Sequence, residues 1–525
     1  MTTITSRPAP TVTVPRLFNV AAEYIEKPVE AGHGDRIAYI YGDEQITYAE
    51  LQRRVNQTGN VLSSLGVEME QRVAVLLPNQ PEFVSSFFGA LKIGAVPALI
   101  STAITPAEQA FLLAESRARA LIACEPLWKA LRERRAEFPF LRHVLVVDGN
   151  NLQVREQDLQ ALTRAASTEC PVAPTTCDDI AFWLHTSGST GTPKWAMHLQ
   201  RNMAYAEQLY AAPFIGLQPG DRILAGGPCF HAYPLGLTTY FPLRAGATVV
   251  LNRERSTPAR MFDLIPEHRV TVFSAVPTLY AQMLHAAAAD TAVDLSSVRV
   301  CLSAAEPLPA ELCRRWQERF GLDILDGIGT TEALHVFMSN RSGEVRPGSS
   351  GRAVPGYEVR LVDDDGAELL TGEIGNLVIK GGSLFAGYWN QHETNQRVLK
   401  GEWYATGDKY SQDTDGYYWY QGRADDMLRV SGHWVSPAEV EAALIEHPAV
   451  LEAAVVGKAD ADELIKPKAV VLLRAGVEPS DALAEELKAH IKMTMAPYNY
   501  PRWVEFATEL PKTATGKIQR FKLRE

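Results

Sequence analysis

The sequence predicts an α/β protein with a large N-terminal body and a small α+β C-terminal domain. Three observations support this. Strand-like apolar runs alternate with amphipathic stretches through most of the chain, a turn-rich β section follows them, and the last ~100 residues carry strand and helix signals of their own. The chain has 525 residues, which is enough for several folding units.

The strand–helix alternation begins with an apolar run at residues 72–77, typical of a buried strand, followed by an amphipathic stretch at 82–93. Alternation of this kind favours layers of helices on mostly parallel sheets. Further strand signals, two of them paired with helix signals, lie at 144–147, 180–184, 247–251, 270–275 with 277–288, and 298–303 with 309–320.

The β section spans residues 351–420, where short strand-like runs are separated by Gly and Asp turns such as 363–366 and 413–416. The sequence pattern changes again at Gly422-Arg-Ala-Asp-Asp426. We therefore predict an N-terminal body at 1–422 and a C-terminal domain at 423–525. Within that domain, strands are expected at 453–456 and 468–473 and a helix at 481–491.

The composition excludes several classes of protein. Hydrophobic residues make up 46% and charged residues 22% of the chain, and the net charge is −11, so neither nucleic acid nor an anionic membrane is the expected partner. The most apolar stretch, 84–104, contains Lys92 and Pro97 and is too interrupted for a membrane span. The six scattered cysteines lack metal-site spacing and fit a reducing compartment. We expect a cytoplasmic protein.

The strongest local signal is Thr186-Ser-Gly-Ser-Thr-Gly-Thr-Pro-Lys194, directly after a strand-like run. Backbone N–H groups and hydroxyls with little side-chain bulk can surround phosphate oxygens, and Lys194 can add a positive charge. Pro193 stands where a Walker motif would have glycine. A flexible Ser/Gly turn is the alternative interpretation of these residues alone.

Four further motifs follow in order, and together the five resemble the adenylate-forming superfamily of acyl-CoA synthetases, luciferases and peptide-synthetase adenylation domains. The resemblance extends from Leu17 to the C-terminus. The other motifs are Gly329-Thr-Thr-Glu332, Tyr404-Ala-Thr-Gly-Asp408, Gly422-Arg-Ala-Asp-Asp426 and Pro511-Lys-Thr-Ala-Thr-Gly-Lys517. The resemblance implies an enzyme that uses ATP, Mg²⁺ and coenzyme A.

The resemblance also implies the residues of the nucleotide site. Glu332 would bind Mg²⁺, as a hard oxygen ligand should, and Thr331 would contact phosphate. Asp408 would accept hydrogen bonds from the ribose hydroxyls, and Arg423 would lie near the ribose and phosphate. The phosphate loop would consist of Thr186, Ser187, Gly188, Ser189, Thr190, Gly191 and Lys194, and the adenine surroundings of Ala305, Glu306, Pro307, Asp326, Gly327, Ile328, Gly329 and Thr330.

Three C-terminal positions complete the implied chemistry. Lys517 would stabilise the negative charge that develops when a carboxylate attacks the α-phosphate, a step that needs a cation because both reactants are anions. Asp425 matches the hinge on which the small domain rotates between acyl-AMP formation and thioester formation. Gly432 would lie along the pantetheine tunnel. From Lys488 to the C-terminus, eight Lys or Arg exceed three Glu, giving +5 against the acidic total.

Within the superfamily the chain most resembles benzoate-CoA and 4-hydroxybenzoate-CoA ligases, on the run Asp323 to His335, the segment Thr406 to Tyr410 and Asp425-Asp-Met-Leu428. The run Phe230 to Gly236 lacks the Asp with which amino-acid adenylation domains bind an α-ammonium group. The resemblance therefore implies an aromatic acid as substrate. The acyl-site residues would be His231, Ala232, Tyr233, Gly236, Ser303, Ala304, Gly327, Gly329, His335 and Val336.

Two alternatives to an aryl-CoA ligase stay open at this point. One is an adenylating enzyme that loads the acyl group onto a carrier-protein thiol. The other is a non-catalytic ligand-binding homologue, motivated by Trp195, because the family normally has glycine after Lys194 and a bulky indole could disturb the phosphate loop. For His231 and His335 a role as satisfied core histidines is the alternative. The oligomeric state is open between monomer and homodimer.

Overall fold

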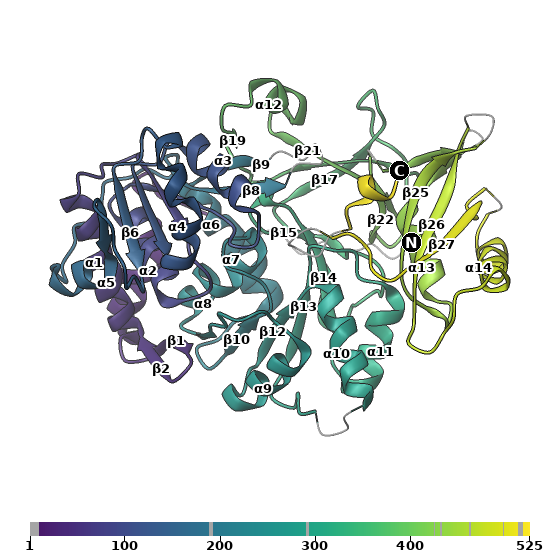
Figure 1. Cartoon of the computed structure of the whole chain (residues 1–525), viewed down its shortest axis with the longest axis horizontal. Coiled ribbons are helices and arrows are strands. Elements are labelled where there is room, and N and C mark those ends of the chain that lie inside the picture. The colour runs from purple at the N-terminus through teal and green to yellow at the C-terminus, as the bar shows by residue number, and fades with distance from the viewer. Residues whose placement is uncertain are drawn as a thin grey trace.

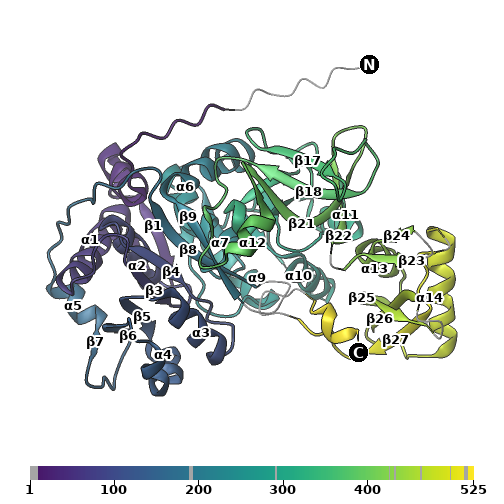
Figure 2. The same cartoon turned by 90° about the horizontal axis from the view of Figure 1, so that it is seen from above.

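The computed structural model describes residues 10–187, 193–289, 293–424, 426–430, 433–460, 464–496, 498–512 and 518–524. Two large sheets form the body, and the C-terminal elements lie at the end of the molecule opposite α1 (Tyr48–Ser64) in both views (Figures 1 and 2). Within the described ranges, none of the helices is at once long and apolar enough to cross a membrane.

The first sheet has nine strands among the described residues, parallel through its centre with antiparallel strands at both edges. Its central strands are short and mostly buried, as expected when helices cover both faces of a parallel sheet. In spatial order the strands are β16 (Arg352–Ala353), β15 (Val336–Ser339), β14 (Ile324–Gly329), β13 (Val300–Ser303), β12 (Val272–Ala275), β10 (Arg222–Ala225), β11 (Thr248–Val250), β1 (Ile37–Tyr41) and β2 (Glu44–Thr47).

The second sheet has eight strands in the part of the chain described here, and it ends in an antiparallel pair that carries the predicted phosphate loop. In spatial order the strands are β19 (Gly387–Tyr388), β9 (Pro193–Leu199), β8 (Ile180–Ser187), β4 (Val96–Leu99), β3 (Arg72–Leu76), β5 (Ala120–Cys124), β6 (His143–Val147) and β7 (Glu156–Asp158).

The largest hydrophobic core lies between the two sheets and includes Val73 and Val75 of β3, Phe87 of α2 and Val249 of β11. Separate cores cover the outer faces, one under α9–α11 and one under α3 and α4. The helices of the body are α1, α2 (Pro81–Lys92), α3 (Pro106–Ser116), α4 (Glu125–Leu131), α5 (Leu159–Ala165), α6 (Gln200–Ala206), α7 (Ala232–Thr238), α8 (Tyr240–Ala245), α9 (Pro258–His268), α10 (Pro277–Ala289) and α11 (Ala310–Phe320).

Local sequence explains where several of these helices begin. The Thr105 hydroxyl caps α3 by accepting from the Glu108 backbone N–H, while the Glu108 side chain accepts from the Thr105 backbone N–H. This reciprocal arrangement satisfies two backbone donors at once. Short π or 3₁₀ segments complete the body: η1 (Ala22–Glu26), η2 (Val29–His33), η3 (Arg132–Glu137), η4 (Glu207–Ile215) and η5 (Thr331–Ala333).

The β section is a five-stranded, largely antiparallel sheet, as its turn-rich sequence predicts. Its elements are β17 (Glu358–Val362), β18 (Gly375–Lys380), α12 (His392–Val398), β20 (Leu399–Lys400), β21 (Trp403–Gln412) and β22 (Tyr418–Arg423). The C-terminal elements have a core of their own, whose described members begin at Leu428. They are β23 (Leu428–Val430), β24 (His433–Val435), α13 (Pro437–Ile445), β25 (Val450–Ala459), β26 (Ile465–Leu473), α14 (Asp481–Thr494), β27 (Trp503–Ala507) and η6 (Arg520–Leu523).

The predicted α/β class and the separate α+β C-terminal elements are confirmed. All six cysteines are free and buried, as their scattered spacing indicates. One prediction differs from the structure: β8 continues through Thr186 and Ser187, and β9 already includes Lys194. The reason is that Thr186 pairs with Lys194 and Ser187 with Pro193, so antiparallel pairing extends into the segment that the sequence assigns to a loop.

Candidate functional site

The β8–β9 pair delivers the ends of the phosphate motif. Thr186 is half-buried. The ammonium of Lys194 lies 5.7 Å from the ring centroid of Tyr388, which belongs to β19, the edge strand that pairs with β9. Gly188, Ser189, Thr190 and Gly191 lie outside the described residues, as does the side chain of Ser187. The described part therefore positions one cation and one hydroxyl of the expected phosphate site.

Glu332 is buried in the 3₁₀ turn η5, which directly follows β14. The Tyr388 hydroxyl donates a hydrogen bond of 2.5 Å to Glu332 Oε1. Burial, reinforced by the negative charge of Glu332, raises the pKa of Tyr388, so the phenol keeps its proton and stays a donor. Phe385 backbone N–H donates to the Glu332 carbonyl at 2.8 Å, which fixes the turn from its other side.

The neighbouring threonines lie at the start of the same turn. Thr330 Oγ1 accepts from the Ala333 backbone N–H at 3.1 Å, so this hydroxyl acts as the cap of η5. Thr331 is half-buried. The cap explains why a Thr-Thr-Glu sequence folds into a tight turn after a strand.

Asp408 and Arg423 are directly paired across β21 and β22. Arg423 Nη1 donates to Asp408 Oδ1 at 2.9 Å and to the Thr406 carbonyl at 3.0 Å. Despite burial of the guanidinium, the charge of Asp408 raises the pKa of Arg423 above its ordinary range. A Cβ on Gly407, whose φ is +78°, would lie 2.7 Å from Arg423 Nη2, so glycine lets the Arg reach its partner.

Two of the expected acyl-site residues, Tyr233 and Gly236, lie against a third, His335. His335 is buried, and its Nε2 lies 3.1 Å from the Tyr233 carbonyl on α7, to which it donates. A Cβ on Gly236 would lie 2.6 Å from His335 Cδ2, so the helix approaches the imidazole only because residue 236 is glycine. Burial lowers the pKa of His335 to about 3, so the ring is neutral at physiological pH.

Three aromatic rings enclose His335. Ring centroids of Phe241, Tyr233 and Tyr210 lie 4.6, 5.1 and 5.2 Å from it. The Tyr233 hydroxyl in turn accepts a hydrogen bond of 3.1 Å from Ser274 Oγ on β12. Sequence reasoning missed Tyr210, Phe241 and Ser274, because they come from three separate elements and no motif connects them to His335.

Gly327 and Gly329, expected at the acyl site, lie where two strands approach closely. A Cβ on Gly327 would lie 2.7 Å from the Met338 carbonyl, and one on Gly329 would lie 2.6 Å from the His335 carbonyl. Strand β15 therefore occupies the space beside both glycines, and it needs them for its close antiparallel approach to β14. Ile328 and Val336 are part of the same strand pair.

The residues expected around adenine lie at the ends of β13 and β14. Ser303 of β13 pairs with Asp326 of β14, and both are buried. Burial raises the pKa of Asp326 well above its ordinary value, although Ser303 opposes the shift, and Asp326 Oδ1 has no hydrogen-bond partner among the described residues. A buried carboxyl oxygen without a partner, next to the backbone of a strand, can hydrogen-bond a heterocyclic base.

The loop after β13 is held in an unusual conformation. Ala304 is buried, and Ala305 has a φ of +79°, which is rare for a residue other than glycine. Glu306 Oε2 accepts 2.8 Å from the Thr278 hydroxyl at the start of α10, which anchors the loop before Pro307. Strain of this kind persists where surrounding contacts over-determine it, often beside a ligand site.

His231 and Ala232 form the N-terminal boundary of α7. His231 is the N-cap residue, half-buried, with its ring 4.9 Å from that of Phe230 and 6.1 Å from that of His185. His185 directly precedes Thr186. The start of α7 thus lies next to the end of β8, which brings the expected acyl and phosphate residues to one region.

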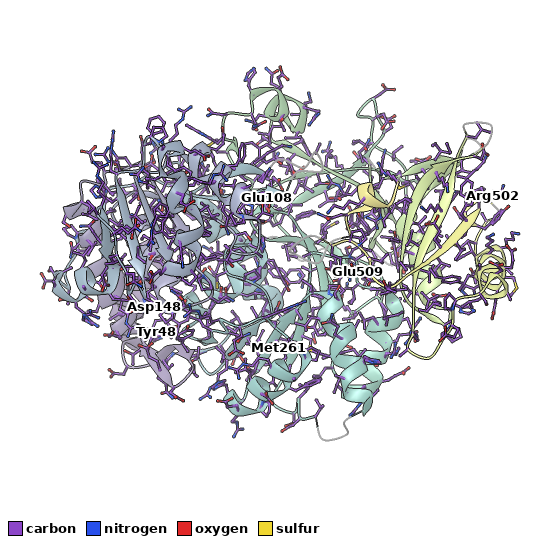
Figure 3. The ribbon with its side chains drawn as sticks, in the orientation of Figure 1. Tyr48, Glu108, Asp148, Met261, Arg502 and Glu509 are labelled. Carbon is purple, nitrogen blue, oxygen red and sulfur yellow. The ribbon has the colours of Figure 1, made fainter. Side chains whose placement is uncertain are left out.

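Lys517, Asp425 and Gly432 lie outside the described residues. Their described neighbours are linked by ion pairs: Arg524 Nη2 lies 2.6 Å and Arg520 Nη1 3.6 Å from the Asp426 carboxylate, and Arg520 also binds Glu441 at 2.7 Å. Figure 3 labels Glu509 on the side of the C-terminal elements nearer to β14, whereas Arg502 lies on the outer side.

The residues present fit a nucleotide with a bound divalent cation. Among the described residues no group of three or more His, Cys, Asp or Glu side chains could hold a metal. A single carboxylate such as Glu332 nevertheless suits Mg²⁺, which keeps most of its ligands as water and phosphate oxygens. The buried Asp408, its half-exposed partner Arg423 and Lys194 supply the acceptor and cations that a nucleotide requires.

Two curated relatives match this chain over nearly its whole length. Benzoate–CoA ligase of Thauera aromatica is 46% identical over 99% of this chain and 98% of its own length. The 4-hydroxybenzoate–CoA/benzoate–CoA ligase of Rhodopseudomonas palustris is 42% identical over 97% of this chain and 94% of its own.

Among solved structures, the anthranilate CoA ligase AuaEII in complex with anthranoyl-AMP is 41% identical and covers 97% of both chains with a TM-score of 0.92. The benzoate CoA ligase from Burkholderia xenovorans LB400 is 42% identical, covers 97% of this chain and 100% of its own, and has a TM-score of 0.88. The AMP-binding enzyme profile matches residues 26–389, and the AMP-binding enzyme C-terminal domain profile matches residues 439–517. The chain therefore belongs to the AMP-binding enzyme family.

Proposed function

We propose that this protein is an AMP-forming aryl-CoA ligase that activates an acid of the benzoate or hydroxybenzoate type. It converts the acid and ATP to aryl-AMP and pyrophosphate, and then transfers the acyl group to coenzyme A with release of AMP. The single observation that carries the proposal is the segment from Glu332 to His335. It holds a buried carboxylate beside Tyr388 and Lys194 at one end, and an imidazole enclosed by aromatic rings at the other.

The first half-reaction joins two anions, so its barrier is mainly electrostatic. Lys194, together with the described end of the phosphate motif at Thr186, supports binding of the triphosphate. Glu332, oriented by Tyr388, would hold Mg²⁺, which would neutralise part of the phosphate charge. Asp408 would accept from the ribose hydroxyls while its partner Arg423 faces the phosphate side. Lys517 is proposed as the cation at the attacking carboxylate.

Neutral, aromatic surroundings favour a ring rather than an alkyl chain or an amino acid. The depressed pKa of His335 keeps a positive charge away from the acyl site, and the rings of Tyr233, Tyr210 and Phe241 offer edges and faces for packing against a benzene ring. The run from Phe230 to Gly236 contains no carboxylate for an α-ammonium group. These features support an aromatic acid as substrate.

In this proposal the second half-reaction requires the C-terminal domain to move relative to the body. We place the body at 1–422 and the mobile domain at 423–525, with Asp425 as hinge and Gly432 beside the pantetheine in the thioester-forming state. The separate core that begins at Leu428 supports movement of the C-terminal elements as a unit. We place the protein in the cytoplasm, because all six of its cysteines are free and buried.

The motive for a non-catalytic homologue is weakened by the position of Trp195. Trp195 is only 2% exposed, and its indole belongs to the core under α3 and α4.

Pyrophosphate release with a panel of benzoates, with and without coenzyme A, tests the proposal. We expect release that depends on a benzoate, and aryl-CoA when coenzyme A is present. Release with medium-chain fatty acids alone would contradict the aromatic site. Aryl-AMP without aryl-CoA, together with loading of a carrier-protein thiol, would favour the carrier-loading alternative.

A further inference from the structure

Trp195 belongs to a group of three indoles beneath the phosphate hairpin, which we call the indole clamp: Trp183 of β8, Trp195 of β9 and Trp389, which directly follows β19. Ring centroids of Trp183 and Trp195 lie 6.0 Å apart, and those of Trp183 and Trp389 lie 4.9 Å apart. The Trp389 backbone N–H donates to the Trp195 carbonyl at 2.9 Å. The clamp thus connects three neighbouring strands on one face of their sheet.

The indole clamp packs against helix α3. Trp195 Nε1 donates to the Leu112 carbonyl at 3.3 Å, and Trp389 Nε1 donates to the Glu115 carbonyl at 3.2 Å. Both acceptors lie near the C-terminal end of α3, where backbone carbonyls lack helical partners or share them. Figure 1 shows α3 beside β9 and β19, and Figure 3 labels Glu108 in its first turn.

A cation completes the clamp. The Arg72 guanidinium lies 5.6 Å from the Trp183 ring centroid and 5.7 Å from that of Trp389. A guanidinium within about 6 Å of an indole ring centroid is attracted by the negative face of the ring. Two indole N–H groups, ring packing and this cation therefore restrain the same strand edge.

The residues that precede two of the indoles are residues of the phosphate site. Lys194 precedes Trp195, and Tyr388 precedes Trp389. Because successive side chains of a strand point to opposite faces, an indole fixed against α3 directs its neighbour to the other face. There the Lys194 ammonium lies 5.7 Å from the Tyr388 ring, and Tyr388 donates to Glu332 at 2.5 Å.

We propose that Trp195 is a positioning residue for adenylation: by seating β9 on α3 it sets where Lys194 stands relative to Tyr388 and Glu332. The proposal rests on the proposed function for its reaction, and its effect belongs to the nucleotide half of that reaction. Trp195 stands where the family normally has glycine, and it adds a fixed anchor one residue from the phosphate-site lysine.

The test compares Trp195→Ala and Trp195→Phe with Trp128→Ala. Trp128 is a matched control because it is equally buried in the same core, on α4, and its indole N–H donates to Glu156 rather than toward the hairpin. For each variant we would measure the thermal midpoint, MgATP binding by calorimetry, pyrophosphate release, and thioester formation from preformed aryl-AMP.

We expect Trp195→Ala to weaken MgATP binding and slow pyrophosphate release by about tenfold or more, because displacement of about 1 Å at a reacting group has effects of this size. Thioester formation from preformed aryl-AMP should stay within about twofold, and Trp195→Phe, which keeps a ring, should recover most of the loss. Trp128→Ala should lower the thermal midpoint with no selective effect on MgATP.

Equal loss in both half-reactions, or a Trp128→Ala variant with the same selective loss, would overturn the proposal. If Trp195→Ala does not fold, the Trp195→Phe variant decides: it should weaken MgATP binding measurably through loss of the bond to Leu112, and an unchanged affinity would contradict the clamp. Failure of the wild-type protein to adenylate any benzoate would instead refute the proposed function, because calorimetric MgATP binding does not depend on the acid.

Discussion

Tyr388 donates its phenolic proton to Glu332 across a distance of 2.5 Å, and this bond connects the edge of the β8–β9 sheet with the turn after β14. Tyr388 belongs to β19 and Glu332 to the turn η5, and the two residues are 56 positions apart in the chain. The bond orients the carboxylate that we propose as the Mg²⁺ ligand.

Tyr388→Phe should therefore impair adenylation without unfolding the protein. Hydrogen bonds to a charged group contribute about 1.5–3 kcal/mol, so we expect pyrophosphate release to fall about tenfold or more at limiting Mg²⁺. Higher Mg²⁺ should restore part of the rate. Tyr418→Phe serves as control, because Tyr418 is buried in the β section and its hydroxyl donates to the Val359 carbonyl at 3.5 Å. The same Mg²⁺ dependence in wild type and Tyr388→Phe would refute this role.

Gly236→Ala should weaken binding of the acid without changing binding of the nucleotide. The added methyl group would lie 2.6 Å from His335 Cδ2 and 2.9 Å from Phe241, so His335 or α7 must move. Overpacking of this kind costs about 1–3 kcal/mol. We therefore expect the variant to have a raised KM for the benzoate and an unchanged KM for ATP. Gly220→Ala is the control, because a methyl group there meets nothing within 4 Å. A raised KM for ATP alone would place residue 236 elsewhere.

Lys517→Ala should separate the two half-reactions. Loss of a cation at the attacking carboxylate is expected to lower pyrophosphate release about 100-fold or more, because preorganised charge is a large part of such barriers. Thioester formation from preformed aryl-AMP should continue, since that step has no triphosphate to stabilise. Lys512→Ala is the control for general damage, because Lys512 lies in the same segment as Lys517. This variant removes the 2.8 Å ion pair between Lys512 and Glu452. Equal loss of both steps would contradict the proposed division of labour.

Glu207 should make stability depend on pH. This buried carboxyl lies at the start of η4, and burial raises its pKa to about 7, with Arg244 opposing the shift. The folded state therefore holds a proton that the unfolded state has lost between pH 4.5 and 7, so this contribution is present at low pH and lost as the pH rises through 7. Relative to wild type, Glu207→Gln should gain up to about 3 kcal/mol between pH 5 and pH 8. Urea unfolding of both proteins at pH 5 and pH 8 measures this change in the free energy of unfolding. The same difference between variant and wild type at both pH values would show that Glu207 is ionised throughout.

Periodicity predicted much of the fold, because buried strands such as β3 and the helices after them, such as α2, have apolar patterns that span a whole element. It could not show that Thr186 and Ser187 continue β8, since that depends on pairing with β9, nor that β15 fills the space beside Gly327. Contacts such as Tyr388 with Glu332, or Tyr210 with His335, arise only when separate sheets pack together. The indole of Trp195 likewise gives no sign in the sequence that it binds α3.

The most direct test of the central claim is a coupled measurement of pyrophosphate and aryl-CoA, with benzoate and hydroxybenzoates as acids and ATP, Mg²⁺ and coenzyme A present. The account predicts that each turnover with an accepted benzoate yields one pyrophosphate and one aryl-CoA, and that medium-chain fatty acids yield neither. Turnover of fatty acids with no turnover of any benzoate would contradict it.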